Sequence, residues 1–97
     1  MRRYVLVSYD VSDPKRWRRV YKVMRGYGQH VQYSVFLCQL TDTEEARLRE
    51  TLYDLIHKET DQVLFARLGS VESDALDRNL TVIGREYDHL DLKKLIF

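Results

Sequence analysis

The sequence has little cysteine and no long run of apolar residues. Its single cysteine, Cys38, excludes an internal disulfide framework and a CxxC metal site. Such cysteine usage is typical of a reducing compartment, so we expect a cytoplasmic protein. No apolar stretch approaches the roughly 20 residues that cross a bilayer, which predicts no membrane span. The apolar stretch after Arg3 runs only from Tyr4 to Tyr9, so we expect no signal peptide.

The chain also lacks the low hydrophobicity and high net charge of disordered proteins. Of its 97 residues 44% are hydrophobic, and its formal net charge is +1. This length predicts one domain spanning 1–97. A domain so small buries only about two-thirds of its unfolded surface, so its core is thin and dimerisation would add stability.

The low net charge conceals an uneven distribution. Residues 1–30 contain eight basic and two acidic side chains, whereas residues 31–97 contain eight basic and thirteen acidic side chains. Such separation is typical of a face that binds a polyanion. A helix with an ordinary solvated outer face is the alternative explanation.

The first third of the chain predicts a strand followed by a helix. Tyr4–Tyr9 is β-branched and aromatic and stops at Asp10, as a strand does. Asp13 as N-cap and Pro14 at the first helical position predict a helix over 14–27. Its apolar stripe has helical spacing and consists of Trp17, Val20, Tyr21 and Met24.

The next segment, 31–40, predicts one long strand, although two short strands with a tight bend also fit its length. Both of its faces are largely apolar, so we expect both to be covered. Thr41 and Glu44 form the capping-box signature of a helix over 42–58. A polar loop with a helical turn is expected over 70–79. Further strands are predicted over 62–68, 80–83 and 92–97.

This succession of elements predicts an α+β sandwich with two helices on one face of the sheet. The strict ferredoxin-like order βαββαβ needs two strands between the helices. The other sheet face would be uncovered in a monomer. Because a large exposed apolar face is unusual, a second chain is expected to cover it.

Asp10 is the first candidate for chemistry, because it ends a strand at the mouth of a strand-to-helix turn. Two such carboxylates, brought together by a twofold axis, repel unless they share a proton or bind a cation. Mg²⁺ suits the pair, since it prefers oxygen ligands and keeps several waters. A metal-activated water is a nucleophile for phosphorus. The alternative is a turn residue that accepts backbone N–H groups.

Six basic side chains follow one another in the first predicted helix. Over about 15 Å of helix they are spaced to follow a phosphate backbone, and they offer no readout of base edges. We expect nucleic-acid binding without sequence specificity from Lys15, Arg16, Arg18, Arg19, Lys22 and Arg25.

The serine, histidine, cysteine and tyrosine residues give weaker evidence of a functional site. Ser34 has no histidine and acid placed to activate it, and the histidines lack the spacing of metal ligands. Cys38 is typical of a small core residue. The tyrosines at periodic apolar positions are core or interface residues, or alternatively base-stacking surfaces: Tyr9, Tyr21, Tyr27 and Tyr33.

The first forty residues also carry four motifs in a fixed order: Tyr9-Asp10-Val11-Ser12-Asp13, Lys15-Arg16-Trp17-Arg18-Arg19-Val20, Tyr27-Gly28 and Val31-Gln32-Tyr33-Ser34-Val35-Phe36. Together they resemble the Cas-two family, the small CRISPR-associated nucleases of the spacer-acquisition machinery. The rest of the chain matches only in length and element order.

The resemblance implies a ferredoxin-like βαββαβ fold and a homodimer whose sheets face each other, with 92–97 pairing with the partner subunit. It implies one metal ion, Mg²⁺ or another divalent cation, between two copies of Asp10, supported by the strand that carries Ser34 and Phe36. It implies metal-dependent cleavage of RNA or DNA and partnership with the CRISPR integrase. The alternatives are a non-catalytic dimeric scaffold that bridges integrase units on duplex DNA, and a regulatory dimer.

Two positions depart from the family pattern. Leu37-Cys38 stands where a glutamate commonly follows the Ser-Val-Phe segment, and His30 stands where a basic residue is frequent. Neither is expected to touch Asp10, but both would weaken nucleic-acid contacts.

Overall fold

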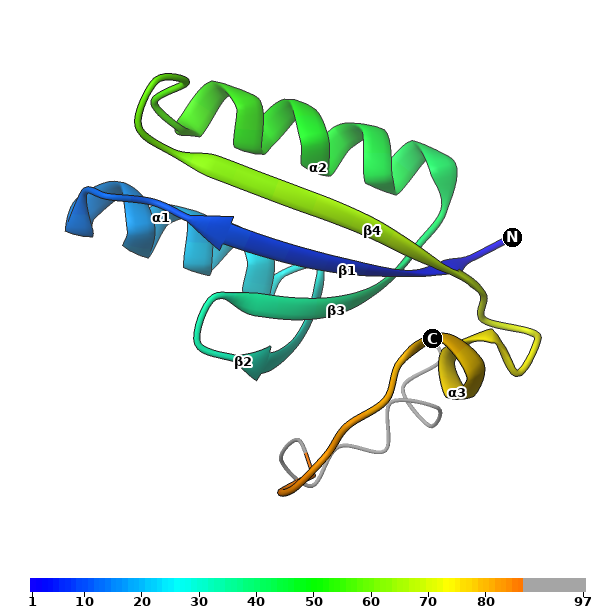
Figure 1. Ribbon diagram of the computed structural model, residues 1–97. Helices are drawn as coiled ribbons and strands as arrows, with labels where there is room; N and C mark the ends of the chain where they lie inside the picture. The colour runs from blue at the N-terminus through cyan, green and yellow to red at the C-terminus, as the bar shows by residue number, and fades with distance from the viewer. Residues whose placement is uncertain (87–97) are drawn as a thin grey trace.

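The computed structural model describes residues 1–86 and contains one four-stranded antiparallel sheet, in the order β2-β3-β1-β4 (Figure 1). The strands are β1 (Arg3–Asp10), β2 (Gly28–Gln32), β3 (Val35–Leu40) and β4 (Gln62–Ser70). The helices are α1 (Pro14–Arg25), α2 (Asp42–Leu55) and α3 (Ala75–Asn79). Through β4 this is the ferredoxin-like order βαββαβ. The strand predicted over 92–97, and its pairing with a partner, lie outside the described residues.

A hairpin stands between α1 and α2, so the single long strand preferred over 31–40 is wrong. β2 starts earlier, at Gly28, and pairs antiparallel with β3 across a turn at Tyr33 and Ser34. Gly28 permits this pairing, because a Cβ there would lie 2.5 Å from the Cys38 sulfur. The turn lacks Gly, Pro and Asn, which are the residues that mark a hairpin in a sequence.

The strand predicted over 80–83 is also absent from the described chain. α3 ends at Asn79, and Leu80 packs with Tyr4 and Leu37 on the sheet face opposite α1 and α2. The segment therefore lies against a face of the sheet, where it lines a pocket with Leu6, Val31 and Val35, and it extends neither edge. The helical turn expected within 70–79 is confirmed as α3.

The predicted helix starts are confirmed by the capping contacts. Asp13 is the N-cap of α1 and accepts a hydrogen bond from the Arg16 backbone N–H at 2.9 Å. Thr41 and Glu44 form the reciprocal capping box of α2. Both helices end two or three residues before the predicted ends, at Arg25 and Leu55.

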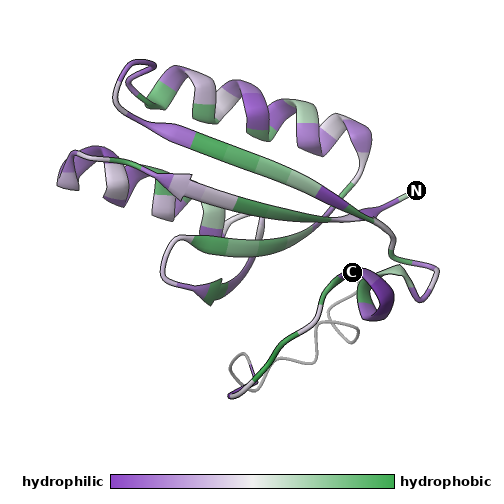
Figure 2. Ribbon diagram, viewed as in Figure 1, coloured by the Kyte–Doolittle hydropathy of each residue, from purple (hydrophilic) through white to green (hydrophobic). Residues whose placement is uncertain are grey.

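The main core lies between the sheet and the two long helices. β1 and β3 contribute alternate side chains to it, and both helices cover them. Figure 2 shows apolar residues concentrated along the strands. The fully buried members include Val5, Val7, Val20, Met24, Phe36, Cys38, Leu48 and Leu52.

Among residues 1–86, the second sheet face is covered only in part. α3 and Leu80 cover Tyr4 and Leu37 near the start of β1. Toward the end of β1 the face is open, and Leu64, opposite Ser8, is 56% exposed. The expectation that both faces of 31–40 are covered is confirmed for β3, where Phe36 and Cys38 on one face and Leu37 on the other are buried. No helix within residues 1–86 is long and apolar enough to span a bilayer.

Candidate active site and nucleic-acid interface

Asp10 is the last residue of β1 and is exposed. Its neighbours Tyr9 and Val11 are buried in the core beneath the helices. Because successive side chains of a strand point to opposite faces, the Asp10 carboxylate belongs to the open sheet face. Within the described chain no group of three or more His, Cys, Asp or Glu side chains is arranged to hold a metal ion. Within residues 1–86, Asp10 is therefore not part of such a ligand group.

The turn that follows Asp10 is fixed by a buried carboxylate, Asp61, from the loop before β4. Asp61 accepts hydrogen bonds from the Ser12 backbone N–H at 3.1 Å, the Ser12 hydroxyl at 3.2 Å and Arg16 Nε at 2.9 Å. It also accepts from the His57 backbone N–H at 2.9 Å and the Thr60 hydroxyl at 3.1 Å. We call this arrangement the Asp61 clamp.

The clamp keeps Asp61 ionised. The Arg16 guanidinium is the main cause that holds the pKa of this carboxyl well below its usual range, and the His57 and Ser12 backbone N–H groups add to it. Burial opposes this shift but is outweighed. Asp61 is therefore an anion near neutral pH, and it joins the Asp10 turn to the α2–β4 loop.

The clamp gives Arg16 a partner within the chain. Its side chain is 26% exposed and forms an ion pair with Asp61. The other five predicted nucleic-acid-binding residues are exposed, and no ion pair involving them is found within residues 1–86. These five are Lys15, Arg18, Arg19, Lys22 and Arg25.

Aromatic rings from α1 and the β2–β3 hairpin form a stack beside the end of β1. The Trp17 ring lies 5.3 Å from Tyr21 at an angle of 11° and 5.1 Å from Tyr33 at 23°. The Trp17 indole N–H donates to the Ser34 hydroxyl at 3.2 Å. The Ser34 carbonyl in turn accepts from the Tyr9 backbone N–H at 3.0 Å, which ties the hairpin turn to β1 next to Asp10.

Ser34 and Phe36, predicted to support the site from one strand, both lie beside Tyr9. The prediction is wrong for Ser34, which belongs to the hairpin turn, and only Phe36 lies in a strand, β3. Phe36 is fully buried and stacks on the Tyr9 ring at 6.3 Å. Burial, followed by the neighbouring Tyr21 and Tyr33, raises the pKa of Tyr9 to about 12. The Tyr9 phenol thus stays protonated near neutral pH and is not a general base there.

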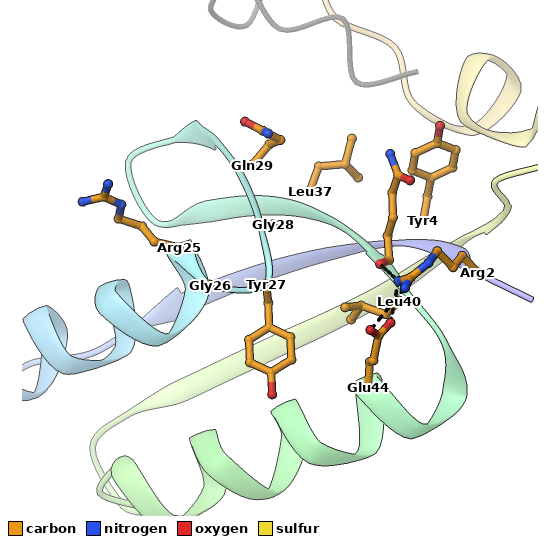
Figure 3. Close-up of a pocket in the computed structure, with 11 residues that line it drawn as sticks. Arg2, Tyr4, Arg25, Gly26, Tyr27, Gly28, Gln29, Leu37, Leu40 and Glu44 are labelled. Carbon is orange, nitrogen blue, oxygen red and sulfur yellow. Dashed lines mark hydrogen bonds and ion pairs between the residues drawn. The ribbon is translucent and has the colours of Figure 1, made fainter. Parts of the chain in front are cut away.

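A cavity of about 370 Å³ lies at the other end of β1, away from Asp10. Figure 3 shows Arg2 at its rim reaching Glu44 of α2, with 2.5 Å between Arg2 Nη1 and Glu44 Oε1. Tyr4, Arg25 and Gln29 also line it. The cavity contains none of the clamp residues, so it is separate from the candidate site.

Element order and sheet order define a ferredoxin-like α+β protein. Residues 1–75 match the family described as CRISPR associated protein Cas2. The chain belongs to this family, which confirms the resemblance carried by its N-terminal motifs.

Relatives and solved structures agree with this assignment. CRISPR-associated endoribonuclease Cas2 1 of Rhodospirillum rubrum is 42% identical over 91 residues, covering 94% of this chain and 87% of that protein. CRISPR-associated endoribonuclease Cas2 of Geobacter sulfurreducens is 32% identical over 88 residues, covering 91% of this chain and 90% of that protein. The crystal structure of Streptococcus pyogenes Cas2 has a TM-score of 0.71 and 37% identity, covering 84% of this chain and 99% of that one.

Proposed function

We propose that the protein is a divalent-metal-dependent endonuclease that cleaves phosphodiester bonds, with RNA as the first substrate to test. The observation that carries this proposal is the position of Asp10: an exposed carboxylate at the end of a central strand, on the sheet face that α1 and α2 leave free. The names of the relatives from R. rubrum and G. sulfurreducens support RNA as substrate.

The active site is formed by two copies of the chain in a homodimer. As far as residues 1–86 are concerned, Leu64 and the neighbouring part of the second sheet face are open, and a second copy placed face to face covers them. A twofold axis between the sheets brings the two Asp10 carboxylates together. The chemistry of this donor pair fits Mg²⁺, which takes oxygen ligands and uses only one or two protein carboxylates. When bound, such a cation supplies Lewis-acid activation of water and of the phosphodiester.

The exposed basic side chains of α1 hold the polyanion. Lys15, Arg18, Arg19 and Lys22 contact phosphates, while the Asp61 clamp keeps the turn after Asp10 in place. Binding is therefore salt-dependent and independent of base sequence. Membership of the Cas2 family supports a role in CRISPR adaptation together with the CRISPR integrase.

A cleavage assay with labelled single-stranded RNA tests the proposal. Asp10→Asn should abolish cleavage in Mg²⁺. It should leave RNA binding in chelator unchanged, because the substitution removes no basic side chain that contacts phosphate. Asp54→Asn, which changes another exposed aspartate on α2, is the matched control and should cleave as the wild type does. Equal cleavage by wild type and Asp10→Asn would remove Asp10 from the chemistry.

The second candidate function is a non-catalytic scaffold that binds duplex DNA and bridges integrase units, and the exposed basic row of α1 favours it. In that case Asp10→Asn leaves DNA binding and integration intact, whereas charge reversal at Arg18 and Arg19 abolishes both. Wild type that cleaves neither RNA nor DNA in Mg²⁺ would support the scaffold.

A further inference from the structure

We propose that Tyr33, stacked on Trp17, is the binding platform for one unpaired base of a single-stranded nucleic acid. The inference rests on the proposed function, since it assigns a base-binding position to the same nucleic-acid site. The basic side chains of α1 (Lys15, Arg18, Arg19 and Lys22) contact phosphates, which single strands and duplexes share. The Tyr33 platform therefore adds a preference for single strands that these side chains do not provide.

The first support is the geometry of the stack. Tyr33 is 75% exposed although one face of its ring lies on Trp17, so the outer face is open to solvent. Trp17 is itself held between Tyr21 and Tyr33 and by its hydrogen bond to Ser34. A ring already fixed at the end of a stack loses little conformational entropy when a base adds to it, which favours binding.

The second support is the rigidity of the hairpin turn. His30 Nε2 lies 3.1 Å from the Tyr33 carbonyl oxygen, and the Ser34 carbonyl accepts from the Tyr9 backbone N–H. These contacts hold the turn at the same end of the sheet as Asp10. A base on Tyr33 therefore places its strand close to the strand-end carboxylate.

The third support is the charge beside the stack. On α1, Arg18, Lys22 and Arg25 form the row next to Trp17 and Tyr21, and the Arg25 guanidinium lies 5.9 Å from the Tyr21 ring centre. Cations beside an aromatic surface are the combination that binds single strands, with phosphates on the cations and bases on the rings. In a duplex each base is already stacked and paired, so its face is not available to Tyr33.

Exposure of a tyrosine ring alone does not make a platform for a base, and Tyr53 on α2 is an exposed tyrosine that lacks the other features. It is 63% exposed, but the Lys58 ammonium lies over its ring at 3.9 Å and no stacked ring supports it from below within residues 1–86. Tyr53→Ala is therefore a matched control for Tyr33→Ala, since each removes one exposed tyrosine ring.

The experiment measures binding in chelator, so that cleavage does not contribute. A labelled single-stranded RNA of about 12 nucleotides and a duplex of the same length are titrated, and affinity is read from fluorescence anisotropy. Trp17 is the only tryptophan of the chain, so its own emission reports whether a base adds to the stack. Thermal melting checks that each variant is folded.

We expect Tyr33→Ala to weaken single-strand binding about 5- to 100-fold, and to leave duplex binding and the salt dependence unchanged because no phosphate contact is lost. Tyr33→Phe keeps the ring and should bind as the wild type does, as should Tyr53→Ala. Single strand, but not duplex, should change Trp17 emission in the wild type.

Equal single-strand affinity of wild type and Tyr33→Ala would overturn the platform while leaving the nuclease proposal intact. Absence of single-strand binding by the wild type would overturn it as well. A wild type that cleaves nothing in Mg²⁺, yet loses single-strand affinity on Tyr33→Ala, would refute the nuclease and retain the platform.

Discussion

Removal of the Asp61 carboxylate tests whether the clamp holds the Asp10 turn. Asp61→Ala leaves the Ser12 and His57 backbone N–H groups and the Arg16 guanidinium without their acceptor. An unsatisfied buried polar group costs about 1–3 kcal/mol. Arg16 is partly exposed and regains water, so we expect a total loss of about 2–4 kcal/mol. In a domain of this size that loss lowers the melting temperature by roughly 10–30 °C.

The loss should depend on pH in a defined direction. The pKa of Asp61 is lowered in the folded state, so its stabilising contribution is present above the unfolded pKa, near 4, and disappears as pH falls toward the lowered value. Urea denaturation of wild type and Asp61→Asn at about pH 7 and about pH 3 measures this dependence. The difference in unfolding free energy between the two proteins should shrink at the lower pH.

Asp54→Asn serves as the control again, because it removes one exposed carboxylate for which no such partners are found among residues 1–86. Two results would refute the reasoning. The first is an unfolding free energy of Asp61→Ala within about 0.5 kcal/mol of the wild-type value at neutral pH, which is the range of ordinary surface substitutions. The second is a difference in unfolding free energy between wild type and Asp61→Asn that is the same at both pH values. Either result would mean that Ser12, Arg16 and His57 find other partners.

Two further predictions concern the β2–β3 hairpin. Gly28→Ala should destabilise the fold by about 1–3 kcal/mol in urea denaturation, because its Cβ would lie 2.5 Å from the Cys38 sulfur and 2.7 Å from the Leu37 carbonyl oxygen. Gly26→Ala, whose nearest such contact is 3.3 Å, should cost less, and an equal cost would contradict the packing argument. Burial raises the pKa of the Cys38 thiol to about 12, so at about pH 8 it should resist alkylation when folded and react in denaturant, as followed by mass spectrometry. Rapid labelling of the folded protein would contradict this.

Local signals in the sequence predicted the helix starts and the position of Asp10. Asp13 before Pro14, and Thr41 before Glu44, act through hydrogen bonds within one turn of helix, so a short window of sequence contains them. Asp10 follows an apolar strand directly, and its place at the strand end needs no distant contact.

Features that depend on distant partners were not predictable in this way. Asp61 meets Ser12 across 49 positions of sequence, so an acid shortly before an apolar run was the only local signal. Arg16 has the spacing of a phosphate-binding residue, and only the fold shows that it pairs with Asp61. The alternation of apolar residues continues through Tyr33 and Ser34, which concealed the hairpin turn and the exposure of Tyr33.

The central place of β1 has a consequence for how such a protein diversifies. β1 pairs with β4 from Arg3 to Asp10 and with β3 from Arg3 to Ser8, so the main chain that leads to Asp10 has paired neighbours on both sides. Tyr33 instead occupies a two-residue connection, the part of a fold where replacements are best tolerated. If the proposed nuclease and base platform are correct, preference for one polymer over another can change at the connection while the backbone that positions Asp10 stays constant.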